Sequence, residues 1–196
     1  MIELLSPSTV DATARVLTDH GFSVFGISTT ALTRSVCDDA VRENGPVALI
    51  ARVGDEVRGV AVAIVDAPRY WKKFMFRHPL FACRVLGKRN KSSRNDAERL
   101  AAGVDAEGDA AAFAVNWNES SPHVARVSLI VVSSSSRGCG LGAEMYEAMF
   151  DHLRARGVVT VLARIGAANT ASLQLHRKTG WTLGRRGARW QALKEL

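Results

Sequence analysis

Residues 137–142 read Arg137-Gly138-Cys139-Gly140-Leu141-Gly142, between an apolar stretch and a helical pattern. Glycines lack a Cβ, so a phosphate can approach the main chain, and the unpaired N–H groups of a first helical turn would point at it. The helix dipole adds on the order of 0.3–1 kcal/mol for each exposed charge contact. The turn therefore predicts a site for a phosphate-bearing ligand.

The segments on both sides of this glycine turn are the clearest elements of the chain. Val124 to Val132 is predicted to be a strand, and Gly157 ends the helix that follows the turn. The apolar residues of that helix fall on one face: Ala143, Met145, Tyr146, Met149, Phe150 and Leu153. Further strands are predicted at 1–5, 47–52, 57–65, 158–163, 181–183 and 188–193, and helices at 9–20, 30–44 and 170–179. The turn Gly54-Asp55-Glu56 predicts a hairpin.

Two other classes of phosphate site use similar turns. A P-loop needs Lys after its last glycine, and no Lys follows Gly142. The dinucleotide pattern fits better, because Gly138, Gly140 and Ala143 satisfy Gly-x-Gly-x-x-Ala. However, that fold normally begins with this unit, and the next strand ends in Ala163-Arg164-Ile165 without an acid for the ribose. Both alternatives are therefore disfavoured.

The turn resembles the Arg/Gln-x-x-Gly-x-Gly/Ala pattern of the GNAT superfamily of acetyl-coenzyme A-dependent N-acetyltransferases. A second segment, Asn169-x-x-Ser172-x-x-Leu175-His176-x-Lys178-x-Gly180-Trp181, resembles the family's Asn-x-x-Ala/Ser-x-x-Leu-Tyr/His-x-x-x-Gly-Phe. Its Leu-His pair is similar to the variant in phosphinothricin acetyltransferases. The resemblance is good from Val124 onward, and follows element order only over the first 65 residues.

This resemblance implies an α/β (α+β) fold with a mixed, mostly antiparallel sheet of six to seven strands flanked by helices. It implies acetyl-coenzyme A as co-substrate and no metal. The coenzyme would be bound by Ile130, Val131, Val132, Arg137, Gly138, Cys139, Gly140, Leu141, Gly142 and Asn169. A helix cap without ligand contact is an equal alternative for Asn169.

The candidate catalytic residues are His176 and Glu119. The resemblance implies that His176 replaces a tyrosine that protonates the departing thiolate, although it could also be a packed helical residue. The strand position where relatives carry a glutamate base holds Arg126, so Glu119, His123 or a water chain could act as the base. Cys139 is not expected to be a nucleophile.

Size and composition favour one domain over residues 1–196. Of 196 residues, 47% are hydrophobic and 23% are charged, as in globular proteins. The three cysteines are too few and too widely spaced for a disulfide framework or a zinc site. With no signal-like start and no spanning apolar run, we expect a cytoplasmic protein.

A basic aromatic insertion is expected at 69–109, with two short amphipathic helices divided near Pro79. Arg69 to Arg99 holds ten Lys/Arg against two Asp/Glu, whereas the rest is near neutral. The segment could be a lid for anionic acceptors, rest on a membrane surface, or form a packing or homodimer contact. An ordinary solvated helix is an equal alternative. Because the basicity is local, we expect no nucleic acid as partner.

The expected function is direct acetyl transfer to a primary amine of a small acceptor. The basic insertion would suit an anionic acceptor. Its Arg77-His78-Pro79-Leu80 stretch resembles segments of some bacterial GNAT proteins near sugar or envelope biosynthesis genes, which suggests a nucleotide-linked or lipid-linked amino sugar. The alternatives are a coenzyme A-binding or regulatory protein without catalysis, and a binder of nucleic acid or membranes through the insertion.

Overall fold

The computed structural model describes residues 1–20, 30–42, 45–79, 82, 120–186 and 189–196. Some sequence predictions fall outside these residues. They are Glu119 and the helix expected after Pro79. The extent of the insertion and the single-domain organisation stay predictions.

The elements follow the predicted order along the chain. The strands are β1 (Ile2–Leu4), β2 (Val47–Val53), β3 (Glu56–Val65), β4 (Val124–Val132), β5 (Thr160–Gly166), β6 (Thr182–Arg186) and β7 (Arg189–Glu195). The α-helices are α1 (Val10–Asp19), α2 (Thr30–Ala40), α3 (Ala67–Arg77), α5 (Leu141–Ala155) and α6 (Thr170–Lys178). Short 3-10 helices, η1 (Pro7–Thr9) and η2 (Ser134–Ser136), precede α1 and follow β4.

The strands form one sheet of seven in the order β1-β2-β3-β4-β5-β7-β6. Its neighbouring strands are antiparallel except for β4 and β5, which run parallel. The hairpin predicted at Gly54 joins β2 to β3. These observations confirm the predicted mixed, mostly antiparallel sheet.

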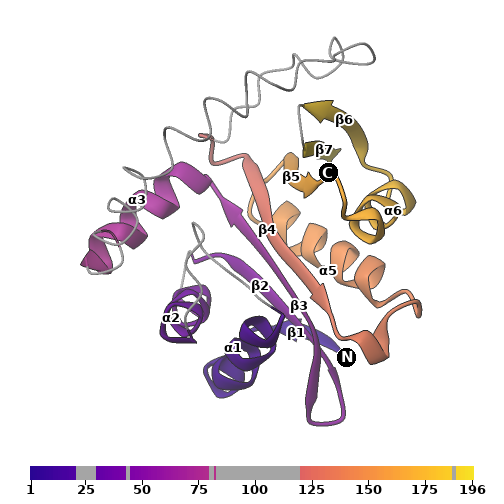
Figure 1. Cartoon of the computed structure of the whole chain (residues 1–196). Coiled ribbons are helices and arrows are strands. Elements are labelled where there is room, and N and C mark those ends of the chain that lie inside the picture. The colour runs from indigo at the N-terminus through magenta and orange to yellow at the C-terminus, as the bar shows by residue number, and fades with distance from the viewer. Residues whose placement is uncertain (21–29, 43–44, 80–81, 83–119, 187–188) are drawn as a thin grey trace.

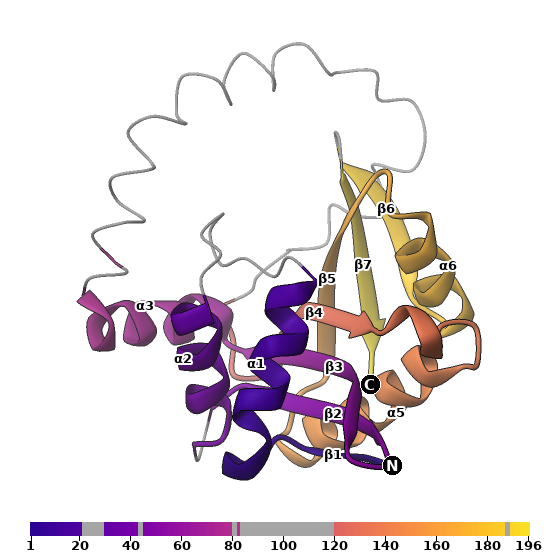
Figure 2. The ribbon, with the colours of Figure 1, turned by 60° about the horizontal axis from the view of Figure 1, so that its bottom comes forward.

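Helices cover both faces of the sheet. Figures 1 and 2 show α1 and α2 on one face and α5 on the other. Strand residues accordingly alternate between two apolar clusters: Leu49 and Ala61 pack toward α5, whereas Ile50 and Val60 pack toward α1 and α2. Because both faces are buried, the central strands read as continuous apolar runs rather than alternating ones.

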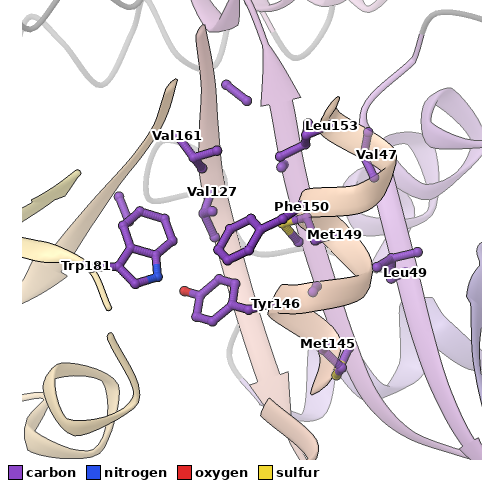
Figure 3. Packing of buried hydrophobic residues seen from close by; sticks show 14 of the residues in the cluster. Val47, Leu49, Val127, Met145, Tyr146, Met149, Phe150, Leu153, Val161 and Trp181 are labelled. Carbon is purple, nitrogen blue, oxygen red and sulfur yellow. The ribbon is translucent and has the colours of Figure 1, made fainter. Parts of the chain in front are cut away.

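The apolar face of α5 forms the centre of the larger core. Met145, Tyr146, Met149, Phe150 and Leu153 are all fully buried, as their helical spacing predicts. Figure 3 shows them against β3, β4 and β5, with Trp181 beside the aromatic rings. The stacked rings of Tyr146 and Phe150 have centroids 5.6 Å apart. The helix that follows the glycine turn is thus fixed firmly to the sheet.

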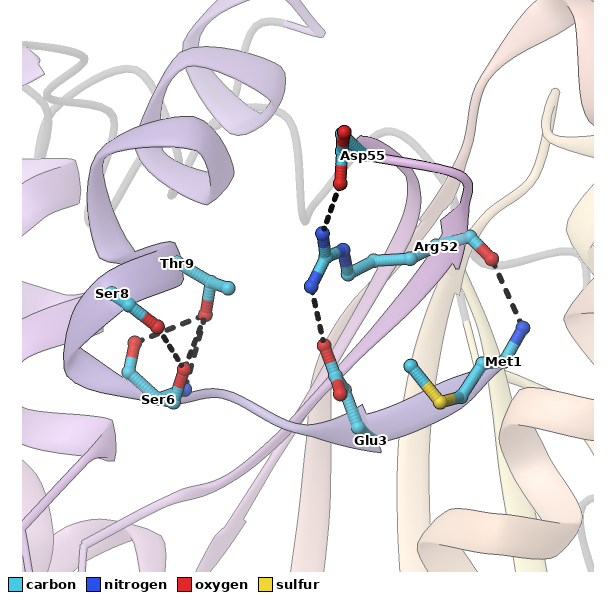
Figure 4. A network of polar contacts seen from close by, with 7 residues as sticks. All are labelled: Met1, Glu3, Ser6, Ser8, Thr9, Arg52 and Asp55. Atoms are coloured by element: carbon cyan, nitrogen blue, oxygen red, sulfur yellow. Dashed lines mark hydrogen bonds and ion pairs between the residues drawn. The ribbon is translucent and has the colours of Figure 1, made fainter.

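Polar contacts hold the N-terminal strand and the start of the first helix (Figure 4). The Ser6 N–H donates to Oγ1 of Thr9 at 3.1 Å, in a capping arrangement that begins the helical segment. Arg52 on β2 reaches both Glu3 of β1 and Asp55 of the hairpin turn. These contacts tie the edge strand β1 to the hairpin.

Several element boundaries differ from prediction, most clearly at β5 and α2. β5 begins at Thr160 rather than Val158, because the Val158 N–H bonds to the Leu153 carbonyl and so closes the end of α5. α2 ends at Ala40 rather than near Asn44. No helix among the described residues is long and apolar enough to cross a bilayer.

Candidate functional site

The parallel strands β4 and β5 separate halfway along their length. They pair only from Val124 with Thr160 to Val127 with Ala163. Beyond that point β5 pairs with β7, and β4 pairs with β3. The β3 register shifts opposite Ser128, which has no partner in the ladder and forms a bulge. The second half of β4 therefore presents main-chain groups that no neighbouring strand uses on its β5 side.

A cavity of about 580 Å³ opens beside this separation. Its walls come from the end of β4, the glycine turn, the start of α5 and one face of α6. Of the ten predicted coenzyme residues, the cavity brings together Ile130, Val131, Val132, Arg137, Gly138, Gly140, Leu141, Gly142 and Asn169. The volume lies in the usual range for small-molecule sites.

The glycine turn has the backbone that its sequence predicts. Gly138 and Gly140 have φ of +82° and +89°, in the left-handed region that favours glycine. Among the described residues, the main-chain N–H groups of 138–142 have no backbone hydrogen-bond acceptor. The first intrahelical donors after the turn are Ala143 and Glu144, which both bond to the Gly140 carbonyl. The turn thus leaves successive N–H donors free at the start of α5, where an anion is favoured.

Gly142 is needed for a different reason, the close approach of α5 to α6. A Cβ at this position would lie 3.2 Å from Cδ2 of Leu175 and 3.9 Å from Cγ2 of Val132. Leu175 and Val132 both line the cavity. A side chain here would therefore push apart the walls of the site.

The charge of the cavity suits a phosphate ligand. Arg137 and Lys178 line it, and no carboxylate among the described residues does. The Arg137 Nε donates to the Val132 carbonyl at 3.2 Å, which fixes the guanidinium near the end of β4. Two cations and the free N–H groups of the turn give a positive potential without an internal counter-charge.

Asn169 is both a helix cap and a cavity residue. Its Oδ1 accepts from the Ser172 N–H at 3.0 Å at the start of α6. The side-chain NH₂ group takes no part in this capping bond. The two readings of Asn169 left open by the sequence are therefore compatible, and its contact with a coenzyme stays a prediction.

His176 does not line the cavity. It is only 2% exposed, and its ring faces Tyr146 of α5 and Trp181. Nδ1 lies 2.7 Å from the Ser172 carbonyl, and Nε2 lies 2.9 Å from the Tyr146 hydroxyl. Burial lowers the pKa of this imidazole, which opposes a protonated donor. Its role as the catalytic acid stays a prediction, but these contacts give it a packing role.

The candidate bases differ in their placement. Arg126 lies in the paired half of β4, opposite Leu162, and His123 bonds to the Gly157 carbonyl at the start of that strand. Neither lines the cavity. Sequence reasoning missed His20, which follows α1 and does line it. Its position after a helix gave no signal, because only the fold brings the end of α1 beside β4.

Cys139 is exposed but is not among the residues that line the cavity. Its Sγ lies 2.9 Å from the Ser136 carbonyl. Its predicted binding contact would therefore be through the main chain. Among the described residues, no three His, Cys, Asp or Glu side chains gather as a metal site.

The model of the acetyltransferase (GNAT) family matches residues 67–181. The chain belongs to this family. The match includes both predicted motifs and the separated strands, so the fold implied by the resemblance is confirmed. The similarity of its Leu-His pair to phosphinothricin acetyltransferases stays a prediction.

Curated relatives of this GNAT protein match over short segments. An L-methionine sulfoximine/L-methionine sulfone acetyltransferase from Pseudomonas aeruginosa is 32% identical over 68 residues, which are 31% of this chain and 40% of the relative. A mycothiol acetyltransferase from Streptosporangium roseum is 36% identical over 59 residues, 30% of this chain and 18% of the relative. The chain thus spans less than half of the length of these relatives.

Solved structures share the whole fold at low identity. A GNAT acetyltransferase from Streptococcus pneumoniae has a TM-score of 0.63 and 12% identity, covering 100% of this chain and 98% of that one. The yncA protein from Salmonella typhimurium, solved with its cofactor acetyl-CoA, has a TM-score of 0.59 and 16% identity, covering 100% and 93%. Both likenesses establish the fold.

Proposed function

We propose that this GNAT protein transfers an acetyl group from acetyl-coenzyme A directly to a primary amine of a small acceptor. The observation that carries the proposal is the cavity between the separated strands, walled at one end by free N–H donors of the glycine turn. The family membership and the relatives named as acetyltransferases support the same activity.

Each part of the cavity suits a different part of acetyl-coenzyme A. The N–H groups of 138–142, with Arg137, would bind the diphosphate. The unpaired edge of β4 at Ile130, Val131 and Val132 would bond to the amides of the pantetheine arm, as another strand would. Asn169 would add a donor from the α6 side.

The transfer requires three catalytic contributions from the protein: charge stabilisation, a general base and a proton donor. The neutral amine forms an N–C bond to the thioester carbon as the C–S bond breaks, and the proton released by nitrogen must leave. Main-chain N–H groups on the unpaired edge of β4 would stabilise the charge that develops on the carbonyl oxygen. A base must take the proton, and the departing thiolate must gain one.

We assign the base to His20. Among the described residues of the cavity, it is the one side chain besides Arg137 and Lys178 that titrates. Its Nδ1 lies 2.8 Å from the Val16 carbonyl, so Nδ1 donates and Nε2 keeps a lone pair. Glu119 remains the base predicted from the sequence and lies outside the described residues.

The acceptor class is drawn from the relatives rather than from the cavity. One relative acts on methionine sulfoximine and methionine sulfone, and another is a mycothiol acetyltransferase. We propose a small amine-bearing metabolite, and anionic acceptors and amino sugars are the first compounds to test.

Turnover with identified products tests the proposal. The protein is mixed with acetyl-coenzyme A and a panel that includes methionine sulfone, methionine sulfoximine and amino sugars, while free thiol is followed. Amine-dependent thiol release with a matching N-acetyl product would support it. Tight coenzyme binding without release across the panel would favour the rival proposal, a coenzyme-binding or regulatory protein.

A further inference from the structure

A second cavity, of about 1040 Å³, lies at the other end of β3 and β4. Its walls come from the end of α2, the start of β2, the end of β3 and one face of α3. Figures 1 and 2 place α3 at the opposite end of β4 from the start of α5. The nine residues of β4 span about 25–30 Å at the usual rise of a strand. This cavity is therefore separate from the glycine turn.

The second cavity is basic. Five cations line it: Arg42, Arg69, Lys73, Arg77 and Arg156. Its two carboxylates are already engaged, because Asp39 pairs with Arg77 at 2.6 Å and Asp66 caps α3 by accepting from the Arg69 N–H. The described lining thus carries a clear excess of positive charge.

Arg69 and Lys73 supply this excess of positive charge. Both side chains are exposed, and because they are four residues apart on α3 they lie on the same face of that helix. Neither has an acidic partner among the described residues. Arg156 donates to the Gly45 carbonyl at 2.8 Å, which orients its guanidinium without neutralising it. Like charges held together repel unless an anion joins them.

The wall behind these cations is rigid. Tyr70 is 9% exposed, and its ring packs against Trp71 and Phe74 with centroids 4.9 and 5.9 Å away. The buried Tyr70 hydroxyl lies beside the Asp39 carboxylate, which also pairs with Arg77. Burial, followed by the nearby Asp39 charge, raises the pKa of Tyr70, so this hydroxyl remains a donor.

We propose that this cavity binds a phosphate-bearing ligand. Guanidinium and ammonium groups converging on one space match the several acceptor oxygens of a phosphate. The volume leaves room for an organic body beside the phosphate. The ligand is a soluble phosphorylated metabolite or the headgroup of an anionic lipid. The inference rests on the second cavity alone and does not depend on acetyl transfer.

Calorimetric titration with inorganic pyrophosphate tests the soluble source. Saturating coenzyme A is present throughout, so that the glycine turn is not the site being titrated. The test variant is Arg69→Ala with Lys73→Ala. The charge-matched control is Arg15→Ala with Lys72→Ala, two exposed residues that do not line the cavity. We expect at least roughly tenfold weaker binding for the test variant and a change below about twofold for the control.

Vesicle cosedimentation tests the lipid source with the same proteins. Phosphatidylcholine vesicles with and without phosphatidylglycerol are compared, and added salt should weaken any specific binding. If the test variant, but not the control, loses binding to phosphatidylglycerol vesicles, the ligand is a lipid headgroup. If the test variant, but not the control, loses binding to pyrophosphate, the ligand is a soluble phosphorylated metabolite. The proposal is overturned if wild type binds neither probe, or if test and control variants bind equally. Circular dichroism of both variants checks that they are folded.

Discussion

The Tyr146 hydroxyl donates a hydrogen bond to Nε2 of His176 across 2.9 Å, deep in the core. The direction follows from the other ring nitrogen, because Nδ1 lies 2.7 Å from the Ser172 carbonyl, which can only accept. A neutral imidazole with its proton on Nδ1 has a lone pair on Nε2 for the tyrosine. The bond joins α5, which begins at the glycine turn, to α6, which carries Asn169 and Leu175. It therefore links two walls of the coenzyme cavity.

Tyr146→Phe is expected to destabilise the protein by about 1–3 kcal/mol. The substitution keeps the ring but leaves Nε2 of the buried His176 without a donor. Urea unfolding followed by circular dichroism measures the change. Thr13→Val is the control, because that buried hydroxyl has no hydrogen-bond partner among the described residues, and it should change stability by less than about 0.5 kcal/mol. Equal losses in the two variants would contradict this account.

The stability of the wild type should fall as the pH drops below about 6.5. Burial lowers the pKa of folded His176, so the unfolded chain binds the proton more readily in this range. A group of this kind contributes a slope of up to about 1.4 kcal/mol per pH unit, with stability rising as pH rises. His176→Gln keeps an acceptor for Tyr146 and removes the titration, so its slope should be smaller. Identical slopes in the wild type and His176→Gln would refute the assignment.

The same His176→Gln variant tests the predicted catalytic acid. Because His176 is buried outside the cavity, we expect kcat within about twofold of wild type once stability is matched. The measurement is amine-dependent thiol release at saturating acetyl-coenzyme A. A loss of a hundredfold or more, the usual size for a lost acid, would restore His176 to catalysis.

Gly138→Ala and Gly142→Ala should both weaken acetyl-coenzyme A binding, but for different reasons. An alanine at Gly138 meets no atom within 4 Å and instead costs about 1–2 kcal/mol in backbone strain, because its φ is +82°. An alanine at Gly142 would crowd Leu175 and Val132 in the cavity wall. Calorimetry should show at least roughly fivefold weaker binding for each. The matched control is Gly157→Ala, which carries the same strain at the far end of α5, so unchanged affinity is expected there.

His20→Gln should lower kcat by about a hundredfold or more and leave the KM for acetyl-coenzyme A nearly unchanged. His123→Gln is the control, because that ring lies outside the cavity, bonded to the Gly157 carbonyl. A normal rate for His20→Gln, with Glu119→Gln inactive, would move the base to the acid predicted from the sequence.

Local signals made much of the fold predictable. The apolar face of α5 has a regular spacing from Met145 to Leu153, and glycines end the helices and turn the hairpin. The separation of β4 from β5 has no such local signal, because strand pairing depends on residues far apart in the chain. Nothing in the sequence of β5 indicates that its pairing with β4 stops at Ala163.

The part of the site formed by main-chain groups could be predicted from the sequence. The part formed by side chains from distant elements was less predictable. The glycine turn needs particular backbone angles, and Gly138 and Gly140 show that need in the sequence itself. The position of His20 depends on how α1 crosses the sheet, and the environment of His176 depends on a tyrosine thirty residues away. Packing between distant elements of this kind leaves no recognisable pattern in the local sequence.

Amide chemical shifts measured by nuclear magnetic resonance during an acetyl-coenzyme A titration test the central claim most directly. The account predicts that the largest shifts, with the onset of slow exchange or broadening, fall on the N–H groups of 138–142 and on Val131 and Val132. Residues of the second cavity, such as Arg69 and Lys73, should move little. Saturable shifts confined to other parts of the chain, or no shifts at millimolar coenzyme, would contradict the placement of the donor site at the glycine turn.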